Sequence, residues 1–579
     1  MTYPTFNPTK QQLAVVSHEA SAFITACPGA GKTRTMVERA RRIVDRAPDH
    51  RGVAFLSFTN AAVDELEGRL RAFGVLPTPI FPSFIGTFDR FLWHFLTAPF
   101  GIEGCESPPR LVPDKETWEI VPFDGAQALP LSCFDRATGK LDAALAKDFR
   151  FDVATRSCSA HEAMAMRVIK NAHRSGLVDF DDVRASVKRK LTDPIFSQRV
   201  GMALSARFRE IFVDEAQDCN PDDLMIVHWL MKAGIVVKVI CDPNQSIYKF
   251  RGGVTDELLK FADTFSDANR LPMSGNFRST PAICSAVVAL RPPAMRKDPD
   301  EPLGKYKSDA TPIYILSYAG KGVSPAIGRE FSKIVTDCGF PLHLTPVLSS
   351  TRSSGARAIG QPTLGETTHM TLILAEAVMN YHFAFAVGNR RKALEKLHRV
   401  VLLVQGRIAS ASEYEDYLAN EGLADGSWRP AIIELANGLS FDPFASSDQW
   451  LKCARDLLAP GLVGDGTIKQ RLRNSDKLGT ALAKAPADSP PARTIHSVKG
   501  SEFPGVCVVL TSQKAGQILD NLEGKGAGEG EEDARKIYVA CSRAERLLAI
   551  AVPKGSAARL MALLTSTGAT FELRQLQSG

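Results

Sequence analysis

The sequence lacks the features that mark secreted and membrane proteins. Its 11 cysteines are scattered over 579 residues without a C-x-x-C pair, which argues against a zinc ribbon or a disulfide framework and favours a reducing cytoplasm. Residues 1–12 contain no apolar segment of the kind that a secretory signal needs. The most apolar stretch, residues 370–387, is interrupted by Glu376, Asn380 and His382. We therefore predict a buried helix there, a cytoplasmic protein and no membrane partner.

A strong net charge is also absent. The chain has 70 Lys and Arg against 64 Asp and Glu, a net charge of +6, which permits a nucleic-acid partner without indicating one. Hydrophobic residues make up 44% and charged residues 23%, which excludes a largely disordered chain. At roughly 150 residues per domain, the length predicts about four domains.

Short apolar segments alternate with helical periodicity. Residues 21–26 and 53–58 are strand-like, and the helical patterns of residues 32–46 and 61–73 follow them. This spacing predicts βαβ units and parallel sheets. Further strands are predicted at 211–213, 236–241, 312–316, 505–510 and 547–552. We therefore predict an α/β fold with two cores, the second built from residues after about 276.

Two mainly helical segments interrupt this pattern and are predicted to be inserted subdomains. A Gly-rich acidic stretch, residues 521–533, is predicted to be a flexible surface loop. The predicted division is 1–89 and 178–275 for the first core, 90–177 for its insertion, 276–361 and 488–579 for the second core, and 362–487 for the second insertion.

Residues 26–33 read ACPGAGKT between a predicted strand and a predicted helix, the context of a phosphate-binding loop. Gly29 and Gly31 let backbone N–H groups turn inward toward phosphate oxygens. Lys32 would reach the β- and γ-phosphates, and Thr33 would offer its hydroxyl to Mg²⁺. The alternative is a glycine-rich turn that binds nothing. The residues predicted to cradle the phosphates are Cys27, Pro28, Gly29, Ala30, Gly31, Lys32 and Thr33.

A second half-site lies far downstream. Residues 211–215, IFVDE, are a predicted strand that ends in two carboxylates. Asp214 would hold Mg²⁺ directly or through water, and Glu215 would polarise the attacking water as general base. The alternative is a strand end with two solvated acids. Together with the loop, this pattern predicts a Mg²⁺-dependent nucleoside triphosphatase and no more, because P-loop folds carry many functions.

Further motifs narrow the class. They read, in chain order, FLSFTNAAVDELEGRL (55–70), GTFDRF (86–91), VDEAQD (213–218), CDPNQSIYKFRGG (241–253), GNFRST (275–280), RTIHSVKGSEF (493–503) and IYVACSRAER (537–546). In this order they resemble the UvrD/Rep family of superfamily 1 DNA helicases, over both α/β cores. The resemblance implies two RecA-like P-loop cores, each with a mainly helical inserted subdomain, and ATP and Mg²⁺ as cofactors.

The resemblance also implies contacts to the nucleotide. Gln11 is similar to the family's adenine-reading glutamine, whose amide can bond two adenine edge groups. Arg34 and Phe277 resemble the two flat groups that sandwich adenine. Glu502 resembles the ribose contact. For Gln11, the alternative is an exposed N-terminal side chain.

Three further side chains resemble the family's catalytic groups. Gln245 is similar to the γ-phosphate sensor. Arg278 and Arg543 are similar to paired arginine fingers, which stabilise the charge that develops during phosphoryl transfer. For either arginine alone, a surface salt bridge would be the simpler interpretation.

A third set matches family positions that face single-stranded DNA, where aromatic rings stack on bases without sequence preference. For Phe58 and Phe250 the alternative is a place in the core. Asp89 stands where the family usually has His, and a carboxylate would repel phosphate there. The predicted DNA-binding residues are Phe58, Thr59, Asn60, Tyr248, Phe250, Arg251 and His496.

The leading hypothesis is an ATP hydrolase that moves along single-stranded DNA and, by resemblance, unwinds in the 3′→5′ direction. The second insertion, roughly 125 residues, is shorter than in large members of the family, so translocation is better supported than processive strand separation. The compact C-terminus also resembles the helicase-like subunits of Gabija phage-defence systems, which work with an OLD-type nuclease. The alternative is therefore a nucleotide- and DNA-end-sensing subunit that regulates such a nuclease. A kinase is disfavoured because it has no use for a second core with two arginine fingers.

Overall fold

The computed structural model shows an α/β chain in two compact units. One unit contains Met1–Ser317 and Val498–Gln575, and the other contains Tyr318–Ser497 and Leu576–Gly579. The residues that the structure describes are 7–46, 50–75, 80–112, 115–123, 126–149, 151–153, 158–246, 255–363, 367–386, 391–410, 413–423, 426–441, 444, 446–483, 488–526 and 530–577.

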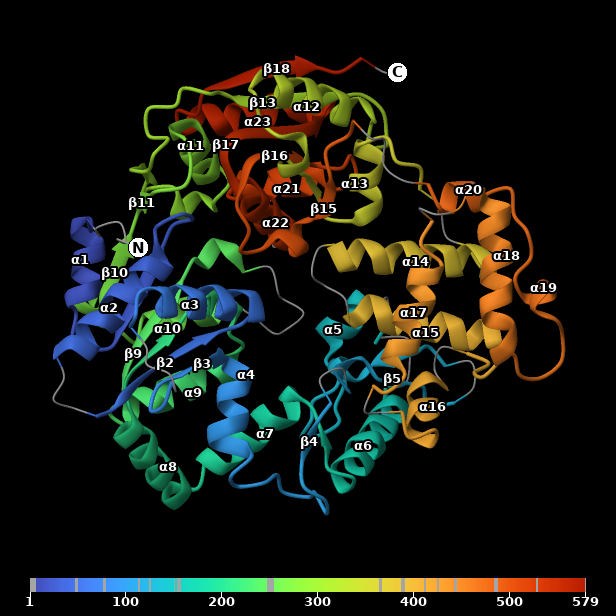
Figure 1. Cartoon of the computed structure of the whole chain (residues 1–579). Helices are drawn as coiled ribbons and strands as arrows, with labels where there is room; N and C mark the ends of the chain where they lie inside the picture. Colours follow the sequence, from blue (N-terminus) through green and yellow to red (C-terminus); the bar gives the residue numbers. More distant parts are fainter. Residues whose placement is uncertain are drawn as a thin grey trace. The chain divides into compact units, whose positions relative to one another are not determined.

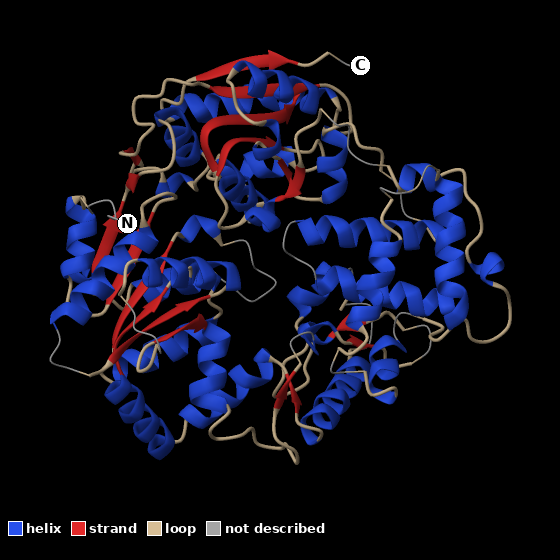
Figure 2. Cartoon of the chain, viewed as in Figure 1, coloured by secondary structure: helices blue, strands red, loops and turns tan. Residues whose placement is uncertain are grey.

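The first unit contains a six-stranded parallel sheet in the order β10-β1-β9-β8-β2-β3, drawn in red in Figure 2 with helices around it. Four of these strands lie where the alternating pattern predicted them, whereas β3 and β10 were not predicted. The bounds are β1 Ala22–Ala26, β2 Gly52–Ser57, β3 Phe84–Thr87, β8 Phe208–Val213, β9 Val236–Cys241 and β10 Arg270–Met273.

Both faces of this sheet are buried. Phe23 and Ile211 belong to one core cluster, together with residues of α9 (Pro221–Lys232). The next residues along each strand, Ile24 and Phe212, belong to another cluster, which includes residues of α2 (Lys32–Arg46). Successive strand residues point to opposite faces, so continuous apolar runs follow from burial on both sides.

The segment predicted as the first insertion has its own small core, which includes Ile120, Leu129 and Phe134. It combines helices with short strands. Its elements are a π-helix Leu92–Thr97, β4 Arg110–Leu111, β5 Glu119–Ile120, β6 Leu129–Pro130, α5 Ala143–Asp148, α6 Ser159–Arg174 and β7 Leu177–Val178.

A second six-stranded sheet has the order β15-β14-β16-β17-β13-β18. Its strands β16, β17, β13 and β18 belong to the first unit, apart from the last residue of β13. The predicted α/β fold with two parallel sheets is thus confirmed. The bounds are β13 Ile313–Tyr318, β14 Val347–Ser349, β15 Ala492–Thr494, β16 Phe503–Val509, β17 Ala544–Pro553 and β18 Phe571–Gln575.

The prediction of a loop over residues 521–533 is wrong at both ends. α21 (Ala515–Leu522) continues past the predicted start, and α22 (Glu531–Cys541) begins before the predicted end. The acidic residues 531–533 form the first turn of α22, where negative charge is favourable near the positive end of the helix dipole.

The second unit contains α14 (Met370–Ala386), the predicted buried helix, whose Tyr381 joins Trp450 and Leu397 in an apolar cluster. In the described parts of the chain, none of the helices is long and apolar enough to span a membrane. The other helices of this unit are α12 Ala326–Asp337, α13 Arg352–Ala358, α15 Arg391–Gln405, α16 Tyr414–Asn420, α17 Arg429–Gly438, α18 Ser447–Leu458, α19 Ile468–Arg471 and α20 Leu478–Ala481.

The remaining α-helices and strands belong to the first unit and are labelled in Figure 1 where there is room. They are α1 Lys10–Ser17, α3 Asn60–Ala72, α4 Phe88–Phe91, α7 Phe180–Leu191, α8 Pro194–Arg207, α10 Thr255–Ala262, β11 Gly275–Asn276, α11 Pro281–Ala289, β12 Glu301–Pro302 and α23 Lys554–Ser566.

Candidate functional site

The predicted phosphate-binding loop leaves β1 and enters α2. Gly29 and Gly31 have φ of 72° and 74°, a left-handed conformation that strongly favours glycine. A Cβ at Gly29 would lie 2.6 Å from Oδ1 of Asn276 and 2.7 Å from Cβ of Arg278. The backbone N–H of Phe277 donates to the Gly29 carbonyl at 2.9 Å. Glycine is therefore required both for the turn and for the close approach of the segment that carries Phe277 and Arg278.

A cavity of about 430 Å³ lies over this loop, within the range of small-ligand sites. It is lined by residues of the first sheet's loops and by residues from 499 to 543, all in the first unit. The residues predicted for the nucleotide site that line it are Pro28, Gly29, Ala30, Gly31, Lys32, Thr33, Asp214, Glu215, Gln245, Phe277, Arg278, Glu502 and Arg543. The cavity therefore collects residues that are up to about 500 positions apart in the sequence.

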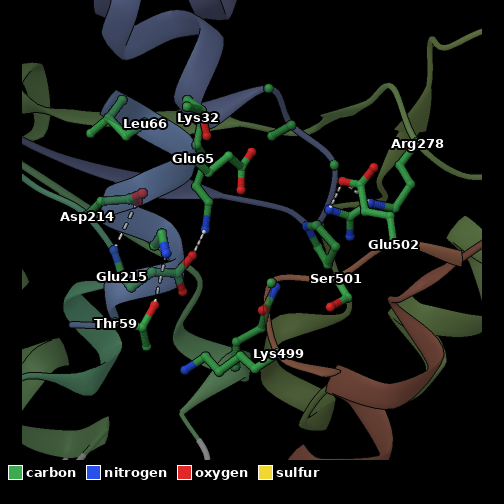
Figure 3. A pocket seen from close by; sticks show the side chains of 18 of the residues that line it. Lys32, Thr59, Glu65, Leu66, Asp214, Glu215, Arg278, Lys499, Ser501 and Glu502 are labelled. Carbon is green, nitrogen blue, oxygen red and sulfur yellow. Dashed lines mark hydrogen bonds and ion pairs between the residues drawn. The ribbon is translucent and has the colours of Figure 1, made fainter. Parts of the chain in front are cut away.

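An ion pair joins the loop to the end of β8. Nζ of Lys32 lies 3.1 Å from Oε1 of Glu215, and Figure 3 shows this contact as a dashed line. Burial opposes both charges, but the pair and its neighbours outweigh burial. The carboxylates of Glu215 and Asp214 raise the pKa of Lys32 above its usual range, and Lys32 and Lys499 lower the pKa of Glu215 to about 2. Glu215 is therefore ionised. It becomes a better proton acceptor when Lys32 and Lys499 move away from it, because their charges are what lower its pKa.

The backbone at Glu215 is strained. Its φ of 56° makes it the one non-glycine residue with positive φ in the described chain, a conformation that costs of order 1–3 kcal/mol and clusters at functional sites. Gln217 holds the carboxylate by donating from Nε2 to Oε2 of Glu215. The strained residue is thus fixed at the edge of the cavity by contacts on both carboxylate oxygens.

Asp214 and Thr33 supply the oxygen atoms expected of a Mg²⁺ site, and both line the cavity. Burial raises the pKa of Asp214 to about 6 against the pull of Lys32, and the Glu215 charge adds to the rise; a bound cation would favour the ionised form. The described residues contain no group of three or more His, Cys, Asp or Glu placed to hold a metal. A Mg²⁺ ion carried by nucleotide phosphates needs only one or two protein ligands, so this donor set fits.

Gln245 and Arg543 are joined directly. Nη2 of Arg543 donates to Oε1 of Gln245 at 2.7 Å, and Nε2 of Gln245 donates to Oδ2 of Asp242 at 2.9 Å. Burial and then the charge of Arg278 lower the pKa of Arg543 to about 10, which still leaves it protonated at neutral pH. Two of the side chains predicted to contact the γ-phosphate therefore lie within hydrogen-bond distance of each other.

Arg278 is held by an acid that was predicted to have another role. Its Nε lies 2.8 Å from Oε1 of Glu502, and its Nη1 donates to the Ser542 carbonyl at 2.8 Å. The resemblance implied a ribose contact for Glu502, whose side chain is 49% exposed. In this structure it is the counter-charge of the predicted arginine finger (Figure 3).

Of the residues predicted to contact adenine, only some lie at the cavity. Both amide atoms of Gln11 bond Ser274, three residues before Phe277. The guanidinium carbon of Arg34 lies 4.3 Å from the centroid of the Phe73 ring. Neither Gln11, Arg34 nor Cys27 lines the cavity, whereas Phe277 does. The structure therefore places one predicted adenine-stacking group at the cavity and the other against Phe73.

Two residues of the site were not predicted, although both stand inside quoted motifs. Nζ of Lys499 lies 2.6 Å from Oδ2 of Asp218, and the two side chains are 8% and 1% exposed. Lys499 also lines the cavity and acts on the charge of Glu215. The sequence held a signal for each of them. Lys499 stands three residues before Glu502, the predicted ribose contact, and Asp218 is the last residue of the VDEAQD motif.

We expect Asp218→Asn to lower the midpoint of thermal unfolding, because it leaves the buried Lys499 without its counter-charge. Breaking a buried pair costs about 3–5 kcal/mol. The matched control is Asp520→Asn, which removes an acid from the exposed pair with Arg559 and should change the midpoint much less. Differential scanning fluorimetry of both variants makes the comparison; equal shifts would contradict the structural importance of the pair.

The predicted DNA-binding residues do not form one described cluster. The Phe58 ring stacks on Phe88 with centroids 5.6 Å apart and an interplanar angle of 13°. Thr59 caps α3 by accepting from the Ala62 N–H at 3.3 Å and lines the cavity. Asn60 is exposed and His496 is half-buried, the latter in the second unit. The other three, Tyr248, Phe250 and Arg251, lie outside the described residues.

Asp89, which was expected to repel phosphate, is neutralised. Its carboxylate pairs with Nη2 of Arg184, whose Nε lies 2.8 Å from Oδ1 of Asp223. Burial opposes the Arg184 charge, but Asp223 and Asp89 outweigh it and raise the pKa of Arg184. The acid that replaces the family's usual His is thus compensated by Arg184 of α7.

Comparisons with known proteins agree with this geometry. Residues 7–118 and 135–266 match the family model described as the UvrD/REP helicase N-terminal domain. The chain is 26% identical over 294 residues to DNA helicase II of Salmonella typhimurium and 26% over 293 residues to DNA helicase II of Escherichia coli. It is 25% identical over 293 residues to the ATP-dependent DNA helicase PcrA of Staphylococcus aureus. Each alignment covers 48% of this chain and 39% of the relative.

The two parallel sheets and the cavity between their loops define a P-loop protein with two α/β cores. Over the matched residues, which make up less than half of the chain, this protein is similar to the UvrD/REP helicases. The chain spans about two fifths of the length of the curated relatives it matches. Arg278, Glu502 and Arg543 lie outside the matched ranges, so their assignment rests on the motifs and on the cavity geometry.

Proposed function

We propose that this chain is a DNA-dependent ATPase that moves along single-stranded DNA and separates strands in the 3′→5′ direction. The observation that carries the proposal is the convergence of Lys32, Glu215, Gln245, Arg278 and Arg543 on one cavity. A phosphate-binding lysine, a carboxylate base and two arginines are the groups that phosphoryl transfer from ATP requires.

The ion pairs support a specific order of events. Lys32 leaves Glu215 for the β- and γ-phosphates when ATP binds, because phosphate is the stronger anion. Glu215 is then free to orient and deprotonate the attacking water. Arg278 likewise exchanges Glu502 for the γ-phosphate, and Arg543 reaches the same group from beside Gln245. Bound Mg²⁺, held by Thr33 and Asp214, would neutralise charge on the β- and γ-phosphates.

The alternative is a nucleotide- and DNA-end-sensing subunit that regulates a partner nuclease in phage defence, with little unwinding of its own. The composition of residues 362–487 favours it, because this segment has 14 Lys and Arg against 14 Asp and Glu. Sequence-independent grip on a DNA duplex depends on an excess of cations. A segment without that excess is poorly suited to hold the duplex ahead of a moving enzyme.

The test measures ATP hydrolysis with and without single-stranded DNA, together with displacement of a strand from duplexes that carry a 3′ or a 5′ tail. DNA-stimulated hydrolysis with displacement only from the 3′-tailed duplex supports the leading proposal. Stimulation without displacement favours the sensing subunit. Hydrolysis that DNA does not change contradicts both.

We expect Phe58→Ala to weaken single-stranded DNA binding and to reduce DNA stimulation of ATP hydrolysis while basal hydrolysis survives. Stacking of a base on a ring contributes about 1–3 kcal/mol, and Phe58 is only half-buried. The measurements are DNA binding by anisotropy, ATPase assays and a thermal melt.

The control is Phe88→Ala, which removes the buried partner of the same stack, 1% exposed. Truncating a buried Phe costs about 3–5 kcal/mol, so this variant should melt early and lose all activities together. If Phe58→Ala behaves in the same way, Phe58 is a core residue and its proposed contact with DNA is wrong.

A further inference from the structure

The outer face of α8 carries large apolar side chains that face solvent. Ile195 is 62% exposed and Met202 is 64% exposed, while Val200 and Leu204 on the other side of the helix are buried. Ile195 and Met202 are spaced i, i+7, so they lie on one face two turns apart. Figure 1 shows α8 at the edge of the first unit. Exposed apolar side chains mark an interaction surface where they gather on one face.

Two exposed aromatic rings flank this row. Phe100, 47% exposed, contacts Phe196 edge-on with ring centroids 4.9 Å apart. Phe81, 68% exposed, lies 5.0 Å from the guanidinium carbon of Arg207. Phe196 and Arg207 are eleven residues apart, close to three full helical turns, so both rings lie along one side of α8, about 100–140° around the helix from Ile195 and Met202. We call Ile195, Met202, Phe81 and Phe100 the α8 stripe.

Most of the charges beside the stripe are positive; the exposed acid Glu103 is paired with Arg189 at 3.0 Å. Nζ of Lys190 lies 5.9 Å from the centroid of Phe100, and Arg199 is exposed between the two apolar residues. At the other end, Nη1 of Arg51 donates to the Ser205 carbonyl at 3.3 Å. The acid at the start of the helix, Asp193, is engaged as the N-cap and accepts from the Ile195 N–H at 2.9 Å.

We propose that the α8 stripe docks an acidic amphipathic helix of a partner protein. A partner helix would bury its apolar anchors against this face, and acidic residues beside those anchors would complement Lys190, Arg199 and Arg207. The 14 residues of α8 extend about 21 Å, enough for about four turns of a partner helix. Nucleic acid is the weaker fit, because phosphates gain nothing from Ile195 and Met202. The stripe shares no residue with the nucleotide cavity, so the two proposals fail independently.

The test uses the whole chain and two synthetic helical peptides with the same apolar positions, one with Glu and the other with Lys at the polar positions. Fluorescence anisotropy should show that the acidic peptide binds at least about tenfold more tightly and that added salt weakens it. Met202→Glu should reduce this affinity by about tenfold or more. The matched control is Val463→Glu, at an exposed apolar residue of another element, which should leave the affinity unchanged. Basal ATP hydrolysis should be the same in both variants.

A photo-crosslinking amino acid at position 202, introduced in the native host cells, should capture a segment that is both acidic and amphipathic. Four results would overturn the proposal: equal affinity for the two peptides, indifference to Met202→Glu, displacement of the peptide by a single-stranded DNA oligonucleotide, or self-association of the chain that Met202→Glu abolishes. Capture of a basic segment, or capture no greater than at position 463, would overturn it as well.

Discussion

Glu215→Gln is expected to bind ATP with nearly parental affinity and to hydrolyse it at least about a hundredfold more slowly, because a positioned general base contributes about 10²–10⁴ in rate. The substitution keeps the shape of a side chain whose backbone is strained at φ 56°. It also keeps an acceptor for Gln217, although it removes the charge that pairs with Lys32. Loss of that competing pair leaves Lys32 free for phosphate, so affinity should not fall.

The measurements are single-turnover hydrolysis and binding of a fluorescent ATP analogue. Glu65→Gln is the matched control, because it removes a carboxylate from the same cavity without touching the end of β8. It should retain most of the parental rate. Near-parental hydrolysis by Glu215→Gln would show that another group is the base.

Arg543→Ala and Arg278→Ala are each expected to reduce the rate of ATP hydrolysis by about 10³–10⁵, with a much smaller effect on ATP affinity. The reason is that the charge they stabilise develops only in the transition state. Arg278 has the further feature that Glu502 neutralises it before ATP arrives. Glu502→Gln should remove this counter-charge from Arg278, which keeps its bond to the Ser542 carbonyl, and should not reproduce the loss of rate.

Arg543 is buried and bonds Gln245, so each variant is also melted to show that it folds. The control is Arg546→Ala, three residues further along the chain, where the arginine pairs with Asp309 at the surface. It should hydrolyse ATP normally. An equal loss of affinity with unchanged turnover in Arg278→Ala or Arg543→Ala would identify those residues as ordinary phosphate ligands.

The pattern of apolar residues along the sequence was sufficient to predict much of the fold. The runs that became β1, β2, β8 and β9 are largely buried on both faces, which is why they are mainly apolar. The buried Glu210 of β8 is an exception, and Arg39 pairs with it. β3 and β10 escaped prediction because they are four residues each and carry little pattern of their own. They are strands because their neighbours in the sheet supply the hydrogen bonds.

In the candidate site too, some residues could be nominated from the sequence, whereas their partners could not. Glycine spacing and strand ends are local signals, and they were enough to nominate Lys32 and Glu215. The two arginines were nominated by the resemblance of their motifs to a known family. The pairing of Arg278 with Glu502, of Lys499 with Asp218 and of Asp89 with Arg184 joins residues 224, 281 and 95 positions apart. Charges so distant in the chain meet only when the fold brings their elements together, so tertiary packing alone could assign these partners and the electrostatics that follow from them.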